Sequence, residues 1–213
     1  MSDLINTAKT IINALEDRIP EETIFDIEYC KNIYAAVKTL ESEKRVVLRN
    51  LVTHFLHHME EREASDIDLG GKGSHGKIWY RVQGYKSPVE QFGVFTMKEL
   101  DILLMSLLED KQAELFFMNR SFDFSFLLEG VRGQRRLRAS MYLDMGHLAL
   151  NMRMIDATIR PISSYSFHPN IIKKLSLEHT KSGLTLVTGI TGSGKSTTLD
   201  AVIDFNNKQM DSH

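Results

Sequence analysis

The sequence is poor in cysteine, has no excess of positive charge and contains no long hydrophobic run. Cys30 is the single cysteine among 213 residues, so no disulfide can form within the chain, and a lone thiol suits a reducing compartment. Basic and acidic residues number 26 and 28, and the resulting net charge of −2 indicates no nucleic-acid partner. No apolar stretch approaches the length that spans a bilayer, and the first residues lack the basic flank of a secretory signal. These absences predict a cytoplasmic protein that is not an integral membrane protein.

What is present is the composition of an ordinary globular protein, and its first third is helical in pattern. Hydrophobic residues make up 42% of the chain, enough to bury one or two cores. Apolar residues recur at helical spacing over 4–15, Pro20 opens a second helical segment toward Leu40, and a third helix carries one apolar stripe. That stripe consists of Val47, Leu51, Phe55 and Met59. Residues 1–63 are therefore predicted to form a helical segment.

The middle of the chain begins with a sequence pattern that is typical of a β-hairpin. The extended run Ala64–Leu69 is followed by the glycine-rich stretch 70–76. An extended pattern then resumes over 77–83 and ends at Gly84. Two strands joined by a glycine-rich turn are the expected result.

A helix and further strands follow the predicted hairpin. Thr96 and Glu99 have the spacing of a capping box, which predicts that a helix begins at Thr96. Phenylalanine and leucine alternate with polar residues over 122–128, and glycine turns separate two more extended runs, 136–142 and 148–154. The pattern predicts an α+β module with an antiparallel sheet.

One dense basic cluster lies in this module. It comprises Arg132, Arg135, Arg136 and Arg138. In a strand Arg136 and Arg138 share a face and Leu137 points to the other, so two guanidinium groups can be aimed at one anion beside the sheet. A basic hairpin can also contact nucleic acid, and a row of strand arginines can simply be a solvated face. The pattern alone leaves these alternatives open.

The most specific signal is the sequence from Gly189 to Ser196, which completes the pattern G-x-x-x-x-G-K-[S/T] of a phosphate-binding loop. In such loops backbone N–H groups converge on the β-phosphate, a lysine contacts the β- and γ-phosphate oxygens, and a hydroxyl coordinates Mg²⁺. Lys195 and Ser196 match the lysine and the metal-binding hydroxyl. The expected nucleotide-binding residues are Gly189, Thr191, Gly192, Ser193, Gly194, Lys195, Ser196 and Thr197.

The surroundings of the loop fit this interpretation. The apolar run Leu184–Thr188 before it is predicted to be a buried strand, and residues 196–205 after it are predicted to be a helix. Another helix is expected to begin at Pro169 and to stop near Gly183. Because a single strand between short helices cannot bury both faces, this part of the fold is expected to be incomplete.

His54 and His58 are spaced so that both imidazoles of a helix could bind one metal ion. The glutamate of the H-E-x-x-H motif is missing, and the spacing provides no third ligand. Ordinary, partly exposed histidines are therefore the expected interpretation.

Five segments, in order, resemble a known family. They are Ala64–Leu69, Asp123–Phe126, Arg136–Arg138, Met152–Asp156 and Leu186–Thr198. Together they are similar to the signatures of bacterial type II secretion and type IV pilus motor ATPases, and most similar to the branch for pilus retraction and twitching motility (PilT-like). The resemblance extends over roughly Ala64 to Asn207 and includes the Walker A sequence of the loop, with Ile190 where the family often has proline.

The resemblance implies a PAS-like α+β module joined by a flexible linker to a RecA-like P-loop ATPase domain. Family members form hexameric rings that use ATP and Mg²⁺ to drive pilus or pseudopilus subunits, and they work with a platform protein of the inner membrane. This implies a cytoplasmic motor with a peripheral position at that membrane. The segments expected here are 1–63 (helical), 64–155 (PAS-like), 156–168 (linker) and 169–213 (beginning of the RecA-like domain).

Arginines of the N-terminal module reach the bound phosphates in the family, and Arg138 and Arg153 fall at the matching positions. With Lys195 they are the expected catalytic residues, because several guanidinium contacts stabilise the charge that develops during phosphoryl transfer. A third family arginine has no counterpart in the stretch 147–151.

The family's acidic box, Walker B carboxylate and histidine box all lie beyond the loop, and the sequence reaches His213 before any of them. The chain is therefore expected to be the N-terminal, ATP-binding portion of such a motor, without hydrolysis on its own. One alternative is a non-catalytic interaction or regulatory module that joins rings of full-length subunits. A second, an unrelated small P-loop kinase, is disfavoured because such enzymes have far more chain after the loop.

Overall fold

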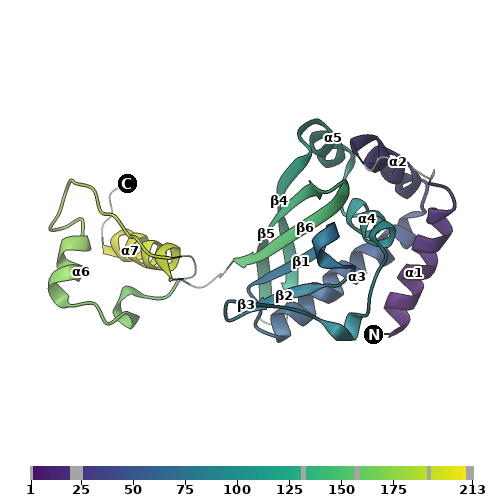
Figure 1. Cartoon of the computed structure of the whole chain (residues 1–213). Helices are drawn as coiled ribbons and strands as arrows, with labels where there is room; N and C mark the ends of the chain where they lie inside the picture. The colour runs from purple at the N-terminus through teal and green to yellow at the C-terminus, as the bar shows by residue number, and fades with distance from the viewer. Residues whose placement is uncertain (1, 20–25, 131–132, 156–158, 191–192, 210–213) are drawn as a thin grey trace. The chain divides into compact units, whose positions relative to one another are not determined.

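The computed structural model describes residues 2–19, 26–130, 133–155, 159–190 and 193–209 (Figure 1). The chain forms two compact units, residues 1–155 and 156–213. We call them the larger and the smaller unit and describe each by itself.

The larger unit is built on an antiparallel sheet in which the described strands follow the order β3-β2-β1-β6-β5-β4. The strands are β1 (Asp66–Gly70), β2 (Trp79–Val82), β3 (Tyr85–Pro88), β4 (Ser121–Gly130), β5 (Gly133–Asp144) and β6 (His147–Ile155). β1 meets β6, so the early hairpins and the late hairpins join in the middle of the sheet. The α+β module with an antiparallel sheet predicted from the alternating patterns is confirmed.

Five helices of the described chain accompany the sheet. They are α1 (Ser2–Glu16), α2 (Ile27–Lys38), α3 (Ser42–Glu61), α4 (Met97–Met105) and α5 (Asp110–Asn119). α3 and α4 lie against one face of the sheet, and α1 and α2 pack on the outside of these two helices (Figure 1). The capping box predicted at Thr96 is present: its hydroxyl accepts from the Glu99 N–H at 3.0 Å, and the Glu99 carboxylate accepts from the Thr96 N–H at 2.7 Å.

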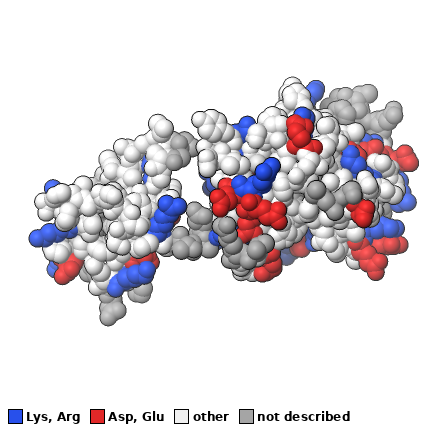
Figure 2. Space-filling model, turned by 90° about the horizontal axis from the view of Figure 1, so that it is seen from below, with Lys and Arg blue, Asp and Glu red and all other residues white. Residues whose placement is uncertain are grey.

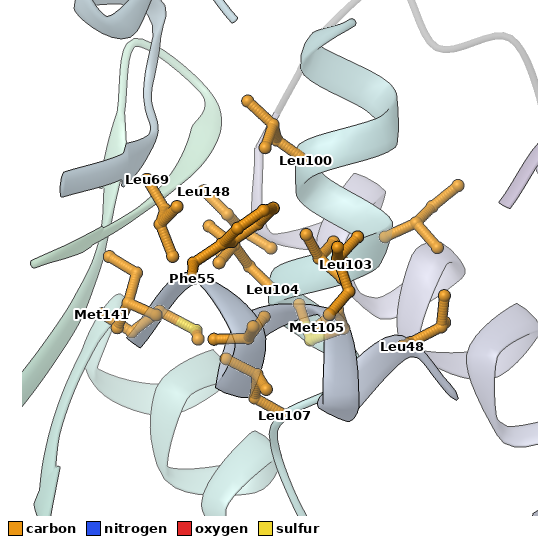
Figure 3. Packing of buried hydrophobic residues seen from close by; sticks show 14 of the residues in the cluster. Leu48, Phe55, Leu69, Leu100, Leu103, Leu104, Met105, Leu107, Met141 and Leu148 are labelled. Atoms are coloured by element: carbon orange, nitrogen blue, oxygen red, sulfur yellow. The ribbon is translucent and has the colours of Figure 1, made fainter. Parts of the chain in front are cut away.

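The core of the larger unit lies between the sheet and α3 and α4. Phe55 of α3 is fully buried among leucines of α4 and of the sheet, including Leu104 and Leu148 (Figure 3). The sheet supplies every second side chain of its strands to this core, because successive strand residues face opposite sides. The inward residues include Ile67, Leu69, Leu137, Ala139, Met141, Leu148, Leu150 and Met152. The helices α1, α2 and α3 therefore share one core with the sheet.

A buried carboxylate lies within this core. Asp101 of α4 is fully buried, and it accepts hydrogen bonds from the Tyr29 hydroxyl at 3.0 Å and from the Leu148 N–H at 2.7 Å. Nδ1 of His147 lies 2.8 Å from the same carboxylate. Burial raises the pKa of Asp101, and the surrounding donors offset part of the desolvation that burial imposes. The cluster joins α2, α4 and β6.

The smaller unit contains the helices α6 (Pro169–Leu175) and α7 (Lys195–Gln209) among its described residues. α6 begins with proline at its first position, as predicted, but it ends at Leu175 because Ser176 is extended, well before Gly183. The prediction of a buried strand at Leu184–Thr188 is wrong: the segment has no regular secondary structure and no strand pairing, and Leu184 and Leu186 are 84% and 74% exposed. A strand needs a neighbour for its backbone hydrogen bonds, and the described part of this unit provides none.

No helix among the described residues is long and apolar enough to cross a membrane.

Candidate functional site

The phosphate-loop sequence lies at the beginning of α7, as its pattern predicts. Gly189 has φ 156°, and a Cβ at this position would lie 2.6 Å from Oγ of Ser193. Gly194, directly before the helix, has φ 85°. Both glycines adopt backbone conformations that other residues rarely tolerate, so the loop depends on glycine at these two positions. Thr191 and Gly192, also predicted to bind nucleotide, lie outside the described residues.

The lysine of the loop lies over the loop itself. Nζ of Lys195 donates to the carbonyl oxygen of Ile190 at 2.7 Å, so the ammonium group spans the turn that precedes the helix. Ser196 is exposed and Thr197 is half-buried, and both belong to the first turn of α7. The Thr198 N–H donates to the Gly194 carbonyl at 2.8 Å, which is the first hydrogen bond of helical type at this end.

These features fit a phosphate group. The N–H groups of a helix's first turn have no partner within the helix, and the helix dipole favours negative charge at this end. α7 is a 15-residue helix, and its first residue is the loop lysine. The arrangement can hold the phosphates of a nucleotide through backbone N–H groups and Lys195, with the Ser196 hydroxyl available to a magnesium ion.

A second set of predicted residues lies on β5 and β6 of the larger unit. Arg138 of β5 is directly opposite Arg153 of β6, so the two arginines share one face of the sheet. Arg136 lies on the same face, and Leu137 between them is fully buried on the other. The alternation predicted for this strand is confirmed, and the two arginines expected to reach phosphate are neighbours.

Each of these two arginines is paired with a carboxylate. Nε of Arg153 donates to Oδ1 of Asp66 at 2.7 Å, and a terminal guanidinium nitrogen of Arg138 donates to Oδ2 of Asp123 at 3.1 Å. Asp66 also lies 3.5 Å from Nε of Arg81, and its side chain is only 4% exposed. Both arginine side chains remain mostly exposed, so their other donors face solvent.

The carboxylate partners continue across the sheet. The side-chain N–H of Asn151 donates to Asp68 at 2.9 Å, and Nζ of Lys86 lies 3.0 Å from the same carboxylate. The hydroxyl of Ser140 donates to Asp123 at 2.6 Å; this bond, and next Arg138, hold the pKa of Asp123 below its usual value. On the visible face of the larger unit, acidic and basic side chains lie next to one another (Figure 2). The carboxylate partners of Arg138, Arg153 and Lys86 make the arginine face a mixed-charge surface.

Sequence reasoning did not identify these carboxylate partners. The signal was available in the strand period, because Asp66 and Asp68 alternate with Ile67 in the predicted strand at 64–69 and must share the face opposite the core. The strand order that brings β1 next to β6 cannot be read from this pattern, since the two strands are far apart in sequence.

The basic cluster seen in the sequence is divided by the fold. Nε of Arg135 lies 3.3 Å from a carboxylate oxygen of Glu60, whose side chain is largely buried. Arg136 donates instead to the hydroxyl of Ser125 on the other face. Arg132 lies outside the described residues. The described arginines therefore form no continuous basic surface of the kind that nucleic acid requires.

The two histidines considered as metal ligands pack against aromatic rings. The ring of His54 lies 5.8 Å from that of Phe92, and His58 contacts Tyr80 and Gln91. Burial lowers the pKa of both imidazoles. Among the described residues no group of three or more histidine, cysteine, aspartate or glutamate side chains could hold a metal ion.

Both sets of residues lie within one match to a known protein family. A family model described as "Type II/IV secretion system protein" matches residues 40–212. The type IV pilus ATPase PilU of Pseudomonas aeruginosa is 32% identical over 110 residues, covering 52% of this chain and 27% of PilU. A twitching motility protein of Neisseria gonorrhoeae is 33% identical over 116 residues, covering 54% of this chain and 29% of that protein.

A solved structure is similar in fold. The crystal structure of the pilus retraction motor PilT with bound ADP superposes with a TM-score of 0.58 at 30% sequence identity, over 73% of this chain and 43% of that one. The chain spans less than a third of the length of the two curated relatives named above.

Proposed function

This chain belongs to the type II/IV secretion system protein family, and on that premise we propose that it is the ATP-binding portion of a motor ATPase. The motor would couple ATP hydrolysis to pilus retraction or protein secretion. The observation that supports this most directly is the phosphate loop at the start of α7, in which two glycines with positive φ lead into Lys195.

The roles of the loop residues follow from their chemistry. The backbone N–H groups from Gly189 to Thr197 would bind the phosphates, Lys195 would place its charge on the β- and γ-phosphate oxygens, and Ser196 would bind Mg²⁺. Lys195 now donates to the Ile190 carbonyl, and a phosphate oxygen would take the place of this acceptor. The magnesium ion, when bound, neutralises charge that develops on the phosphates.

Arg138 and Arg153 would supply the further positive charge. They are neighbours on the sheet, their outer donors are exposed, and each is oriented by a carboxylate, Asp123 or Asp66. A guanidinium held on one side by a carboxylate is restricted in orientation and keeps N–H groups for a phosphate. We assign both residues to phosphate contact, from this subunit or from a neighbour in a ring.

The larger assembly is part of the same proposal. Residues 64–155 would be the PAS-like module and residues 169–213 the beginning of the RecA-like domain, with 156–168 as the linker. Six subunits would form the ring, which would act at the cytoplasmic side of the inner membrane on a platform protein. The matched segment is 27% of one curated relative and 29% of the other, so these whole-protein properties would involve further chain.

A second candidate function is that of a non-catalytic module that associates with full-length motor subunits. One observation favours it: the segment before the loop, 184–188, is unpaired and exposed, whereas a P-loop is ordinarily supported by a buried strand. The folded larger unit would then be the active part of the chain.

Binding and turnover of Mg-ATP by the purified chain distinguish the two functions. We expect nucleotide binding in the wild type, loss of binding in Lys195→Ala, and no change in Lys174→Ala, a matched exposed lysine on α6. Binding that is equal in all three proteins would contradict the assignment of the loop. No binding by the wild type, together with co-purification with a full-length motor, would support the non-catalytic module instead.

A further inference from the structure

The two edges of the sheet differ in how well they are protected. β3 at one edge has four residues, and two of them are Lys86 and Pro88. β4 at the other edge has ten residues and contains neither lysine nor proline. Short strands, lysine and proline are the usual means by which proteins prevent a sheet edge from pairing with another chain. β3 has all three, and β4 has none of them.

The side chains of β4 also suit pairing. On the core side it carries Phe122, Phe124 and Phe126, all half-buried, so a rim of aromatic surface remains in contact with water. On the other side Leu127 is 60% exposed. The charge of Asp123 is already engaged by Arg138 and by the Ser140 hydroxyl. In the part of the chain that the structure describes, no further strand pairs with β4.

We propose that β4 is a self-association surface, at which two copies of this chain pair their β4 strands antiparallel and continue one sheet through both molecules. Antiparallel pairing of identical strands has a two-fold axis, and residues directly opposite each other lie on the same face of the sheet. The aromatic face of one copy is therefore continued by the aromatic face of the other. A self-complementary strand favours a second copy over an unrelated partner.

The charges on β4 select the register. An axis at Asp123 would place two copies of this carboxylate opposite each other, and an axis at Phe126 would place Asp123 opposite Glu129. Like charges directly opposite destabilise a strand pair. An axis at Ser125 avoids both conflicts.

With the axis at Ser125, apolar residues meet along the aromatic face: Phe124 lies opposite Phe126 of the second copy, and Phe122 opposite Leu128. On the other face Asp123 lies opposite Leu127, so no like charges meet there. An axis at Phe124 also avoids like charges, but it shortens the paired segment by two residues in each copy. The longest register without a charge conflict is therefore the one centred on Ser125.

A cysteine placed on the proposed axis tests this register. Cys30 is fully buried, so the introduced thiol is the reactive one. In the 213-residue chain we expect Ser125→Cys to form a disulfide-linked dimer under mild copper-catalysed oxidation, because the two thiols would face each other across the axis. Ser87, an exposed serine on the protected edge β3, provides the matched control: Ser87→Cys should form no disulfide-linked dimer. Equal cross-linking of the two variants, or none in either, would overturn the proposal.

Sedimentation equilibrium of uncross-linked protein provides a second test. Leu127→Asp places a carboxylate directly opposite Asp123 of the second copy, once on each side of the axis, and we expect it to weaken self-association at least tenfold because like charges directly opposite destabilise a strand pair. Tyr85→Asp on β3 replaces a side chain that is 83% exposed, and it should leave association unchanged. A wild-type chain that is monomeric up to its solubility limit would overturn the proposal, and so would self-association that Leu127→Asp does not change. Monomeric wild type with Leu127-dependent capture of a foreign strand would assign the edge to another protein.

Discussion

The larger and the smaller unit contain the same kinds of apolar side chains but bury them to very different extents. In the larger unit most of the leucine, isoleucine and phenylalanine side chains of the described helices and strands are buried in one core. In the smaller unit Ala201 and Ile162 are the buried apolar residues of the described part, while Leu184, Leu199 and Ile203 face solvent. An apolar pattern in sequence therefore becomes a core only when a second layer of structure covers it.

The second layer differs for a topological reason. The hairpins of the larger unit pair with one another, so every inner strand has two neighbours and the helices have a continuous face to cover. Among its described residues the smaller unit has α6, α7 and a short 3-10 helix (Ile162–Ser164), and polar contacts join them. Asn206 illustrates this: its side chain donates to the Leu175 carbonyl at 3.0 Å and accepts from the Leu177 N–H at 2.7 Å.

The contrast in cores is tested most strongly by truncating one apolar side chain to alanine in each unit. Phe55→Ala should lower the free energy of unfolding of the larger unit by about 3–5 kcal/mol, because it leaves a cavity between α3, α4 and the sheet. Ile203→Ala should change the free energy of unfolding of the smaller unit by less than about 0.5 kcal/mol, since this side chain is exposed. Urea denaturation followed by circular dichroism measures both. Similar losses of unfolding free energy in the two variants would contradict the conclusion that only the larger unit has an extensive apolar core.

The importance of polar contacts in the smaller unit is tested at Asn206. Asn206→Ala leaves a carbonyl and an N–H near α6 without their partner, and we expect a local loss of about 1–3 kcal/mol. Hydrogen exchange of the Leu177 amide reports this loss directly, and the unfolding of the larger unit should not change. Asn207→Ala is the matched control, because that neighbouring side chain is exposed. Unchanged protection of Leu177 in Asn206→Ala would show that other contacts hold the unit.

The pH dependence of stability tests whether His54 and His58 are packed within the larger unit. Burial holds the pKa of His54 and His58 below the ordinary value, so the unfolded chain binds protons more readily than the folded one. Their contribution to stability is complete above the ordinary histidine pKa of about 6.5 and is lost as the pH falls through the lowered values. The free energy of unfolding of the larger unit should therefore fall on mild acidification. A double variant, His54→Gln with His58→Gln, should show a flatter pH dependence; the same slope in both proteins would contradict the assignment.

The smallest effect is expected on the exposed face of the sheet, where no core is involved. The Ser140 hydroxyl lowers the pKa of Asp123 through its hydrogen bond, and Arg138 lowers it through both a hydrogen bond and its charge. Ser140→Ala and Arg138→Ala should therefore each raise this pKa. Carbon-detected NMR titration of the aspartate side chains measures both changes. An unchanged pKa in either variant would show that the contact does not act on this carboxylate.

The fold was predictable where the sequence determines structure locally. Alternation over 122–128 and 136–142, glycine punctuation and the Thr96 capping box all correspond to observed elements, because strand period and helix capping depend on near neighbours in sequence. The helix α5 and the order of the strands were not predicted. The strand at 184–188 was predicted wrongly. Its apolar pattern is typical of a strand, but a strand forms only when another strand, distant in sequence, pairs with it.

The candidate site was predictable to a similar degree. The loop pattern located Lys195 at the start of a helix, and strand period placed Arg136 and Arg138 on one face. The pairing of Arg153 with Asp66 was not predictable, since it depends on the contact between the first and the last strand of the module.

The buried cluster around Asp101 has a consequence for the order of folding during synthesis. Tyr29 leaves the ribosome early, but the carboxylate that its hydroxyl binds comes from α4, and the other partners of that carboxylate, His147 and the Leu148 N–H, come from the beginning of β6. Because the buried carboxylate would lack most of its donors until β6 has been made, α2 can dock firmly only late in translation. A ribosome stalled before residue 147 should carry a nascent chain in which the N-terminal helices remain accessible to chaperones and proteases.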